Sequence, residues 1–357
     1  MSRPAILVTG AAGAVGSALV RRLHAAGERV IATDRAETAL PSRRRDLLVR
    51  PADLTENKGL DRLLRGADRV VHTAAVVDLS AGLDQLAAVN VEATMALYRA
   101  AAVAGVRRFV YLSAGTVYRL SATGTYRESD PLEANNGYER SKQLAEAFLQ
   151  SQASGGPGVI ILRPSLIYGP GTRHLGASLA CLAPVLQASM SRVIGLSGGP
   201  RINWVHVDDV AAAAAHLLVS GQPGEAYNVA DDDAIGFGDL VSHSLRVYGL
   251  EPAFELPYPP MGLMRQAAPL LARAGFLFDG LNGTFERIWD RLCAEHELVR
   301  AFQPRLDAAA LTYAHQHFLL LNDKLADTGF RPRYPSIEHG WAETIAWYQQ
   351  QRWLPHN

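Results

Sequence analysis

The stretch that decides the fold is Thr9–Gly16, TGAAGAVG. Its first two residues are the last two of the apolar run AILVTG at residues 5–10. A strand, a turn with glycines three residues apart and a helix are typical of a loop that holds a pyrophosphate. Gly10 permits the tight turn, Gly13 lets the backbone approach the phosphate, and Gly16 lets the helix pack closely. The free N–H groups of the helix would then meet the anion. The stretch predicts a dinucleotide site, formed by Gly10, Ala12, Gly13, Ala14, Val15 and Gly16; a glycine-rich turn without a ligand is the alternative.

A carboxylate closes the second expected strand, RVIATD at residues 29–34. Asp34 can accept hydrogen bonds from both ribose hydroxyls and would repel a 2′-phosphate, which favours NAD over NADP. Arg35 could instead serve a 2′-phosphate, and Asp34 could be a simple turn residue. Asp53, with its neighbour Leu54, stands where a third strand could end. It could bind the adenine amino group, and a helix N-cap is an equal alternative.

The first half of the chain alternates apolar β-rich runs with helical patterns, and this predicts an α/β fold. Strand–helix alternation with apolar strands implies a doubly wound parallel sheet covered on both faces, a Rossmann fold. We expect residues 1–165 to form the NAD-binding domain, with returns near 202–230. Residues 166–357 would mainly form a smaller, mostly helical substrate domain. The expected strands are 5–10, 29–34, 69–75, 108–114, 158–165 and 227–230, and the expected helices lie near 14–26, 84–105, 138–151 and in much of 251–321.

Composition excludes several classes of partner. The 357-residue chain has 35 basic and 35 acidic residues, and this zero net charge argues against nucleic acid as a partner. Two cysteines without ligand spacing predict a reducing, cytoplasmic location, and no apolar run is long enough to predict a transmembrane helix. His206, Asp208 and Asp209 could suggest a metal. A helix cap explains them better, so no metal is expected.

Only three lysines occur in the chain, and one of them, Lys142, follows Tyr138 by four residues in YERSK. Residues four apart share one face of a helix. A helical wheel over 138–151 places Tyr138 and Lys142 on the buried side and Glu139 and Glu146 on the exposed side. A nearby ammonium and a cationic nicotinamide would lower the pKa of the tyrosine hydroxyl. The pair would then exchange a proton with a substrate alcohol or carbonyl.

Five motifs in this order resemble the extended short-chain dehydrogenase/reductase family: TGAAGAVG, HTAA (72–75), YLSAGTVY (111–118), YERSK and LRPSLIYGPG (162–171). The C-terminal stretch resembles its 3β-hydroxysteroid dehydrogenase branch. The resemblance implies an NAD-dependent oxidoreductase with Tyr138 and Lys142 as the catalytic pair. Asn90 would brace their helix. Further cofactor contacts would come from Thr73, Ala74, Ala75, Pro164 and Ile167, with His72 beside them.

One position departs from the family pattern. Ala114 stands where relatives carry a serine or threonine that binds the substrate oxygen, so Thr116 is the expected replacement, ahead of Ser113. This departure leaves a non-catalytic NAD-binding protein as one alternative.

Two features bear on the substrate. In the sugar-nucleotide branch of this family, an asparagine holds the pyrophosphate of the substrate, and the resemblance places Leu166 at its position. Residues 254–281 are strongly apolar. These features favour a small apolar, sterol-like alcohol or ketone, including a 4-carboxysterol, over a sugar nucleotide as substrate of an epimerase or dehydratase. A peripheral membrane contact and a homodimer are both compatible with the sequence.

Overall fold

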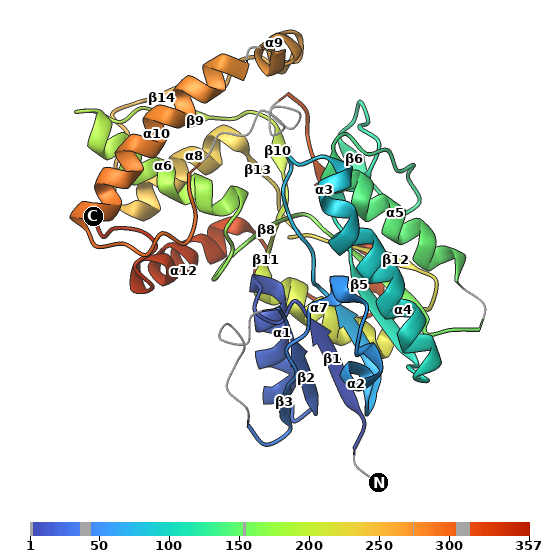
Figure 1. Cartoon of the computed structure of the whole chain (residues 1–357). Helices are drawn as coiled ribbons and strands as arrows, with labels where there is room; N and C mark the ends of the chain where they lie inside the picture. Colours follow the sequence, from blue (N-terminus) through green and yellow to red (C-terminus); the bar gives the residue numbers. More distant parts are fainter. Residues whose placement is uncertain (1–2, 36–43, 153–154, 274, 305–314) are drawn as a thin grey trace.

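Seven parallel strands form the central sheet, in the order β12-β7-β5-β4-β1-β2-β3 (Figure 1). The computed structural model describes residues 3–35, 44–152, 155–273, 275–304 and 315–357, and the side chains of 268–279 fall outside the described part. The predicted doubly wound α/β fold is confirmed, and a short edge strand, Leu47–Val49, lies just before Asp53, where a third strand could end. The strands are β1 (Ala5–Thr9), β2 (Val30–Thr33), β3 (Leu47–Val49), β4 (Ala67–His72), β5 (Arg108–Leu112), β7 (Gly158–Pro164) and β12 (Ala226–Val229).

Helices cover both faces of this sheet because every central strand is apolar on both sides. On one face, α1 (Ala14–Ala25) and α7 (Val207–Ser220) bury side chains such as Leu19 and Val210 against Ile6 and Val8. The other face is covered by α2 (Leu60–Leu64), α4 (Ala93–Val103) and α5 (Gly137–Ser151). The expected helix near 84–105 consists of α3 (Leu83–Ala87), the π-helical turn η3 (Ala88–Glu92) and α4.

The second half of the chain builds a separate apolar core from helices and short strand pairs. Residues 251–321 are less helical than expected, because Glu255–Pro257 and Leu319–Leu320 pair as strands. Residues 305–314 lie outside the described part. The helices are α6 (Leu175–Ser189), α8 (Phe237–Tyr248), α9 (Met261–Arg273), α10 (Gly275–Glu295) and α12 (Ile337–Gln350), with a short α11 (Asp323–Asp327). The short strands are β6 (Thr125–Tyr126), β8 (Leu166–Tyr168), β9 (Gly195–Ser197), β10 (Arg201–Ile202), β11 (Trp204–His206), β13 (Ile235–Gly236), β14 (Glu255–Pro257) and β15 (Leu319–Leu320).

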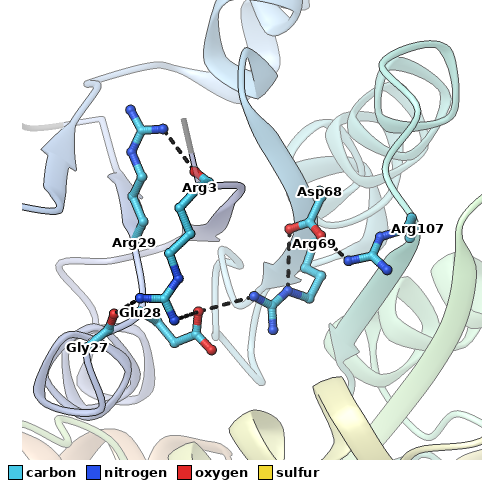
Figure 2. A network of polar contacts seen from close by, with 7 residues as sticks. All are labelled: Arg3, Gly27, Glu28, Arg29, Asp68, Arg69 and Arg107. Carbon is cyan, nitrogen blue, oxygen red and sulfur yellow. Dashed lines mark hydrogen bonds and ion pairs between the residues drawn. The ribbon is translucent and has the colours of Figure 1, made fainter. Parts of the chain in front are cut away.

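The amino edge of the sheet is joined by a chain of arginine and carboxylate side chains (Figure 2). Glu28 lies 3.2 Å from the guanidinium of Arg69 and 3.9 Å from that of Arg3. Asp68 in turn pairs with Arg69 and with Arg107. These groups link the starts of β1, β2, β4 and β5, although ion pairs at a surface contribute little free energy each. The polar side chains at the amino edge therefore pair with one another. In sheets of this kind, ligands bind at the carboxyl ends of the strands.

A membrane-spanning helix is not found in the described residues: none of their helices combines the length and the apolar character that crossing a bilayer requires.

Candidate active site

The glycine loop lies at the carboxyl end of β1, where it turns into α1 with no room for side chains. Gly10 has φ +66°, and a Cβ there would lie 2.7 Å from the backbone nitrogen of Ala74. A Cβ on Gly16 would collide with the carbonyl oxygen of Gly10, so the start of α1 can approach β1 this closely only with glycine. Gly13 is the N-cap of α1 and offers no capping side chain, so the first N–H groups of the helix are left for an anion. These features fit the pyrophosphate of a dinucleotide.

Asp34 lies beside this loop, at the end of β2. Its carboxylate accepts hydrogen bonds from the backbone nitrogens of Ala12, at 3.1 Å, and Arg35, at 2.8 Å. The half-buried carboxylate is thus held at the loop, where the adenosine ribose of a dinucleotide would lie.

Asp53 lies after the edge strand β3 and caps the short 3₁₀ helix η2 (Leu54–Glu56). Its carboxylate accepts from the backbone nitrogen of Thr55 at 2.9 Å and from its hydroxyl at 2.6 Å, and these bonds lower the pKa of Asp53. The structure thus provides the expected helix cap, while contact of Asp53 and Leu54 with adenine stays a prediction.

A buried hydrogen-bond chain fixes the segment that follows β4. Thr94 donates its hydroxyl proton to the carbonyl oxygen of Asn90, so it must accept from Nε2 of His72. The Nδ1 atom of His72 then accepts from Thr9 Oγ1, at 2.7 Å. Burial lowers the pKa of His72 to about 3, with Lys142 adding to the effect, so this imidazole is neutral. Thr73 donates to the carbonyl oxygen of Thr9 at 2.7 Å, which places 73–75 against the glycine loop.

Tyr138 and Lys142 lie on the buried face of α5, as the spacing predicted. Lys142 is 2% exposed, and its Nζ donates to the carbonyl oxygen of Leu112 at 2.8 Å. The same ammonium lies 5.0 Å from the ring centre of Tyr111 and 5.9 Å from that of Tyr138. Asn90 donates to Ser141 Oγ at 2.9 Å, so η3 contacts α5 between the two residues of the pair.

The expected pKa of Tyr138 differs from that in the structure. Burial, followed by the charge of Glu139, raises the pKa of Tyr138 well above its usual value of 10. The desolvation of a phenolate outweighs the attraction of a lysine 5.9 Å from the ring. A lowered pKa would therefore depend on the positive charge of an oxidised nicotinamide.

Two glutamates of α5 are not exposed, which corrects the helical-wheel prediction for Glu139 and Glu146. Both glutamates are buried. Glu139 accepts from the backbone nitrogen of Asn135 at 2.7 Å, and Glu146 forms an ion pair with Arg163 of β7 at 2.7 Å. A wheel cannot reveal such burial, because the partners come from a loop and a strand outside the helix.

The hydroxyls of Ser113 and Thr116 lie in the segment that joins β5 to α5. Ser113 follows β5, and Thr116 lies in the 3₁₀ turn η4 (Gly115–Val117), which contacts α5. Both hydroxyl oxygens are buried without a hydrogen-bond partner among the described residues. Buried hydroxyls are normally paired, so two orphaned ones near Tyr138 indicate a place for a ligand oxygen. Ala114 between them is buried and extended, with φ −146°.

Apolar side chains surround Tyr138. Its ring belongs to a cluster with the buried side chains of Leu86, Ala114 and Val117. Half-buried side chains of the 76–81 loop and Leu132 pack against this cluster: Val76, Leu79, Ala81 and Leu132. The reacting group would therefore meet a substrate in apolar surroundings.

The turn that follows β7 lies over the start of α1. Pro164 ends β7 and is buried, and Ile167 of β8 is half-buried. A Cβ on Gly171 would lie 3.7 Å from that of Ala14, so the 167–171 turn lies next to the glycine loop. The structure thus brings Pro164 and Ile167 to the same edge of the sheet as the glycine loop, as expected of cofactor contacts.

His206 caps α7, as expected for this group of residues. Its Nδ1 accepts from the backbone nitrogen of Asp208 at 3.2 Å, and Asp209 accepts from the backbone nitrogens of Arg333 and Tyr334.

The sheet order, the glycine loop, Asp34 and the buried Tyr138–Lys142 pair together define a dinucleotide-dependent oxidoreductase with a Rossmann fold. The chain belongs to the NAD-dependent epimerase/dehydratase family, whose sequence model matches residues 6–230. The family resemblance, the class of enzyme and the cofactor NAD expected from the sequence are thereby confirmed.

Relatives of this chain include steroid or sterol enzymes and sugar-nucleotide dehydratases. A 3β-hydroxysteroid dehydrogenase/Δ5→4-isomerase of Mycobacterium tuberculosis is 32% identical over 260 residues, covering 68% of this chain and 69% of the relative. Sterol demethylase protein B of Methylococcus capsulatus is 36% identical and covers 62% and 68%. A dTDP-glucose 4,6-dehydratase of Streptomyces griseus is 30% identical and covers 69% and 79%. The family alone therefore does not define the substrate.

The fold is shared with solved enzymes. The structure of dTDP-glucose 4,6-dehydratase from Bacillus anthracis, in complex with NAD, superposes with a TM-score of 0.70 at 19% identity, covering 99% of both chains.

Proposed function

We propose that this protein oxidises or reduces the 3-position of an apolar, sterol-like alcohol or ketone with NAD. The observation that supports this proposal is the apolar cluster around Tyr138, which contains Leu86, Ala114 and Val117. A sugar bound beside Tyr138 would require polar partners instead. The steroid and sterol relatives support the same substrate class.

The cofactor would be held by the loop from Gly10 to Gly16, by Asp34 and by residues 73–75, with Arg35, Asp53, Leu54, Pro164 and Ile167 at the edges of the same site. When bound, NAD supplies the hydride acceptor or donor. Tyr138 would exchange the proton of the substrate hydroxyl, and Lys142, buried beneath it, would support that transfer. Thr116, ahead of Ser113, would donate a hydrogen bond to the substrate oxygen, the role that Ala114 cannot fill.

Residues 166–357 would mainly cover the substrate in this proposal. Two arginines that would be candidates to hold a diphosphate there have other partners: the guanidinium of Arg173 lies 5.1 Å from the ring centre of Trp353, and Arg201 donates to the carbonyl oxygen of Ala234. Leu166 is half-buried and packs on the core of the second half. Burial of a ring-sized apolar ligand in such surroundings returns about 25 cal/mol per Å² before the costs of binding.

A sugar-nucleotide epimerase or dehydratase is the second candidate, because the Streptomyces griseus dehydratase matches over 69% of this chain. In that case the hydride would return to the substrate, with no net change of the cofactor.

One experiment separates the two candidates. A 3-hydroxy- or 3-ketosterol, with and without a 4-carboxylate, should raise the melting temperature of the NAD-loaded protein and be turned over with net NADH change. UDP- and dTDP-glucose should do neither. A clear thermal shift with UDP-glucose, and none with any sterol, would favour the epimerase or dehydratase.

A further inference from the structure

Helix α5 carries a third ionisable residue in line with the proposed pair. Tyr138, Lys142 and Glu146 follow one another at intervals of four residues, so they lie along one side of the helix. We propose that Glu146 is a positioning residue that, anchored by Arg163, favours the protonated form of the buried amine of Lys142 beneath Tyr138. The proposal builds on the assignment of Tyr138 and Lys142 to the reaction, and it adds a group that the family's sequence motif did not suggest.

Glu146 is fixed in place as a carboxylate. Its side chain is fully buried, and Arg163 reaches it with Nη2 at 2.7 Å from Oε2 and with Nε at 3.2 Å from both oxygens. Arg163 is itself held by the hydroxyl of Tyr118, at 3.0 Å, and by the carbonyl oxygen of Glu128, at 3.1 Å. Two guanidinium nitrogens that contact both oxygens hold the Glu146 side chain in one orientation.

The other groups that face Lys142 carry no charge. Tyr111 of β5 is buried, and burial raises the pKa of its hydroxyl well above 10. His72 of β4 is neutral, with its pKa lowered to about 3. Tyr138 is protonated at neutral pH because burial raises its pKa. The carbonyl oxygen of Leu112 supplies a dipole at 2.8 Å. Within the described part of the chain, Glu146 is thus the anion whose charge acts on Lys142, and Arg163 lies behind it.

Burial and Glu146 act on Lys142 in opposite directions. Burial lowers the pKa of the ammonium, the carboxylate of Glu146 opposes that shift, and together they place the pKa of Lys142 at about 7. Without the carboxylate, a smaller fraction of the amine would be protonated at neutral pH, and its attraction for an ionised Tyr138 would weaken. Glu146 therefore keeps Lys142 within the range in which it can both hold and release a proton.

The small number of lysines allows a direct test on the cofactor-free protein. With lysine labelled at Cε by ¹³C, only Lys58, Lys142 and Lys324 titrate, and Lys58→Arg and Lys324→Arg assign the signals. Glu146→Gln should lower the titration midpoint of Lys142 by about one pH unit or more, the size of a close opposite charge. Glu146→Asp, which keeps the charge, should restore most of the shift.

Glu139→Gln is the matched control, because it makes the same change at another buried carboxylate of α5. The Lys142 midpoint should stay within about 0.3 unit of the unmodified protein, since Glu139 contacts Asn135 instead. Equal shifts in the two variants would overturn the proposal, as would no shift in folded Glu146→Gln.

A second variant covers the case in which Glu146→Gln does not fold because Arg163 is left unpaired in the core. Glu146→Gln combined with Arg163→Met removes both charges, and it should lower the Lys142 midpoint by less than Glu146→Gln alone, because loss of the Arg163 cation acts in the opposite direction. An unchanged midpoint in this folded double variant would overturn the proposal. The titration requires neither substrate nor turnover, so failure of the sterol assignment leaves it interpretable.

Discussion

Tyr138 and Lys142 are both buried, and burial disfavours the charged form of each side chain. Burial raises the pKa of the phenol and lowers that of the amine, so both groups are driven toward their neutral forms. A proton can then leave Tyr138 at neutral pH only when further positive charge is near. This makes the proposed reaction dependent on the oxidised cofactor as well as on Lys142.

Replacing Tyr138 by phenylalanine removes the proton donor while keeping the ring that packs against Ala114 and Val117. We expect turnover to fall by about two orders of magnitude or more, the usual size of a general acid–base contribution. Affinity for NAD, measured by isothermal titration, should stay close to that of the unmodified protein. Near-normal turnover would disprove the catalytic role of Tyr138.

The two orphaned hydroxyls offer a ranked comparison. Thr116→Val should lower turnover by about tenfold to a hundredfold, the effect of one lost hydrogen bond to a charged group, with little change in NAD affinity. Ser113→Ala should have a smaller effect on kcat. The opposite order would assign the substrate oxygen to Ser113.

At the scale of elements, the close approach of α1 to β1 decides whether the cofactor loop can form. Gly16→Ala would drive a methyl group into the carbonyl oxygen of Gly10. We expect a loss of about 1–3 kcal/mol in the free energy of unfolding. NAD affinity should fall at least about tenfold, because the first N–H groups of α1 would move away from the pyrophosphate.

Gly262→Ala in α9 is the control for this helix-directed change, since a Cβ there would meet nothing within 4 Å. Its melting temperature and NAD affinity should match those of the unmodified protein. If Gly16→Ala behaves like this control, the glycine loop is not as closely packed as the structure indicates.

Sequence patterns revealed those elements whose signals are local. The glycine spacing predicted the β1–α1 turn, and the four-residue interval predicted the buried pair on α5. The burial of Glu146 could not be predicted, because it depends on Arg163, which lies 17 residues further along the chain on a neighbouring strand. The edge strand β3 was anticipated only as a strand that could end near Asp53, and its bounds were not predicted because three residues are too few to show a period.

At the scale of the whole molecule, Asp231, just after β12, makes the free energy of unfolding depend on pH. Both oxygens of the Asp231 carboxyl group are buried. Neither accepts a hydrogen bond of normal geometry from the described residues. Burial, reinforced by the charge of Asp209, raises the pKa of Asp231 to about 8. The folded protein therefore binds one proton more than the unfolded chain between the ordinary value of 3.8 and about 8. Stability is lost across this window as the pH rises.

Asp231→Asn should remove this cost. Its gain in melting temperature over the unmodified protein should be larger at about pH 8.5 than at about pH 5, since only the carboxylate loses its proton. Asp327→Asn, at an exposed carboxylate away from Asp231, should give the same small change at both values. A gain for Asp231→Asn that does not depend on pH would show that the carboxyl group is not protonated in the folded state.

The two ends of the parallel strands have separate roles, and this separation has a practical consequence for handling the protein. Arg3 lies at the amino edge with Gly27 and Glu28, whereas the cofactor loop lies at the far end of β1 (Figure 1). An affinity tag placed ahead of Arg3 would anchor the molecule to a sensor surface with its ligand edge facing the flowing solution. Immobilised in this orientation, the protein is suited to screening small-molecule libraries without the support blocking access.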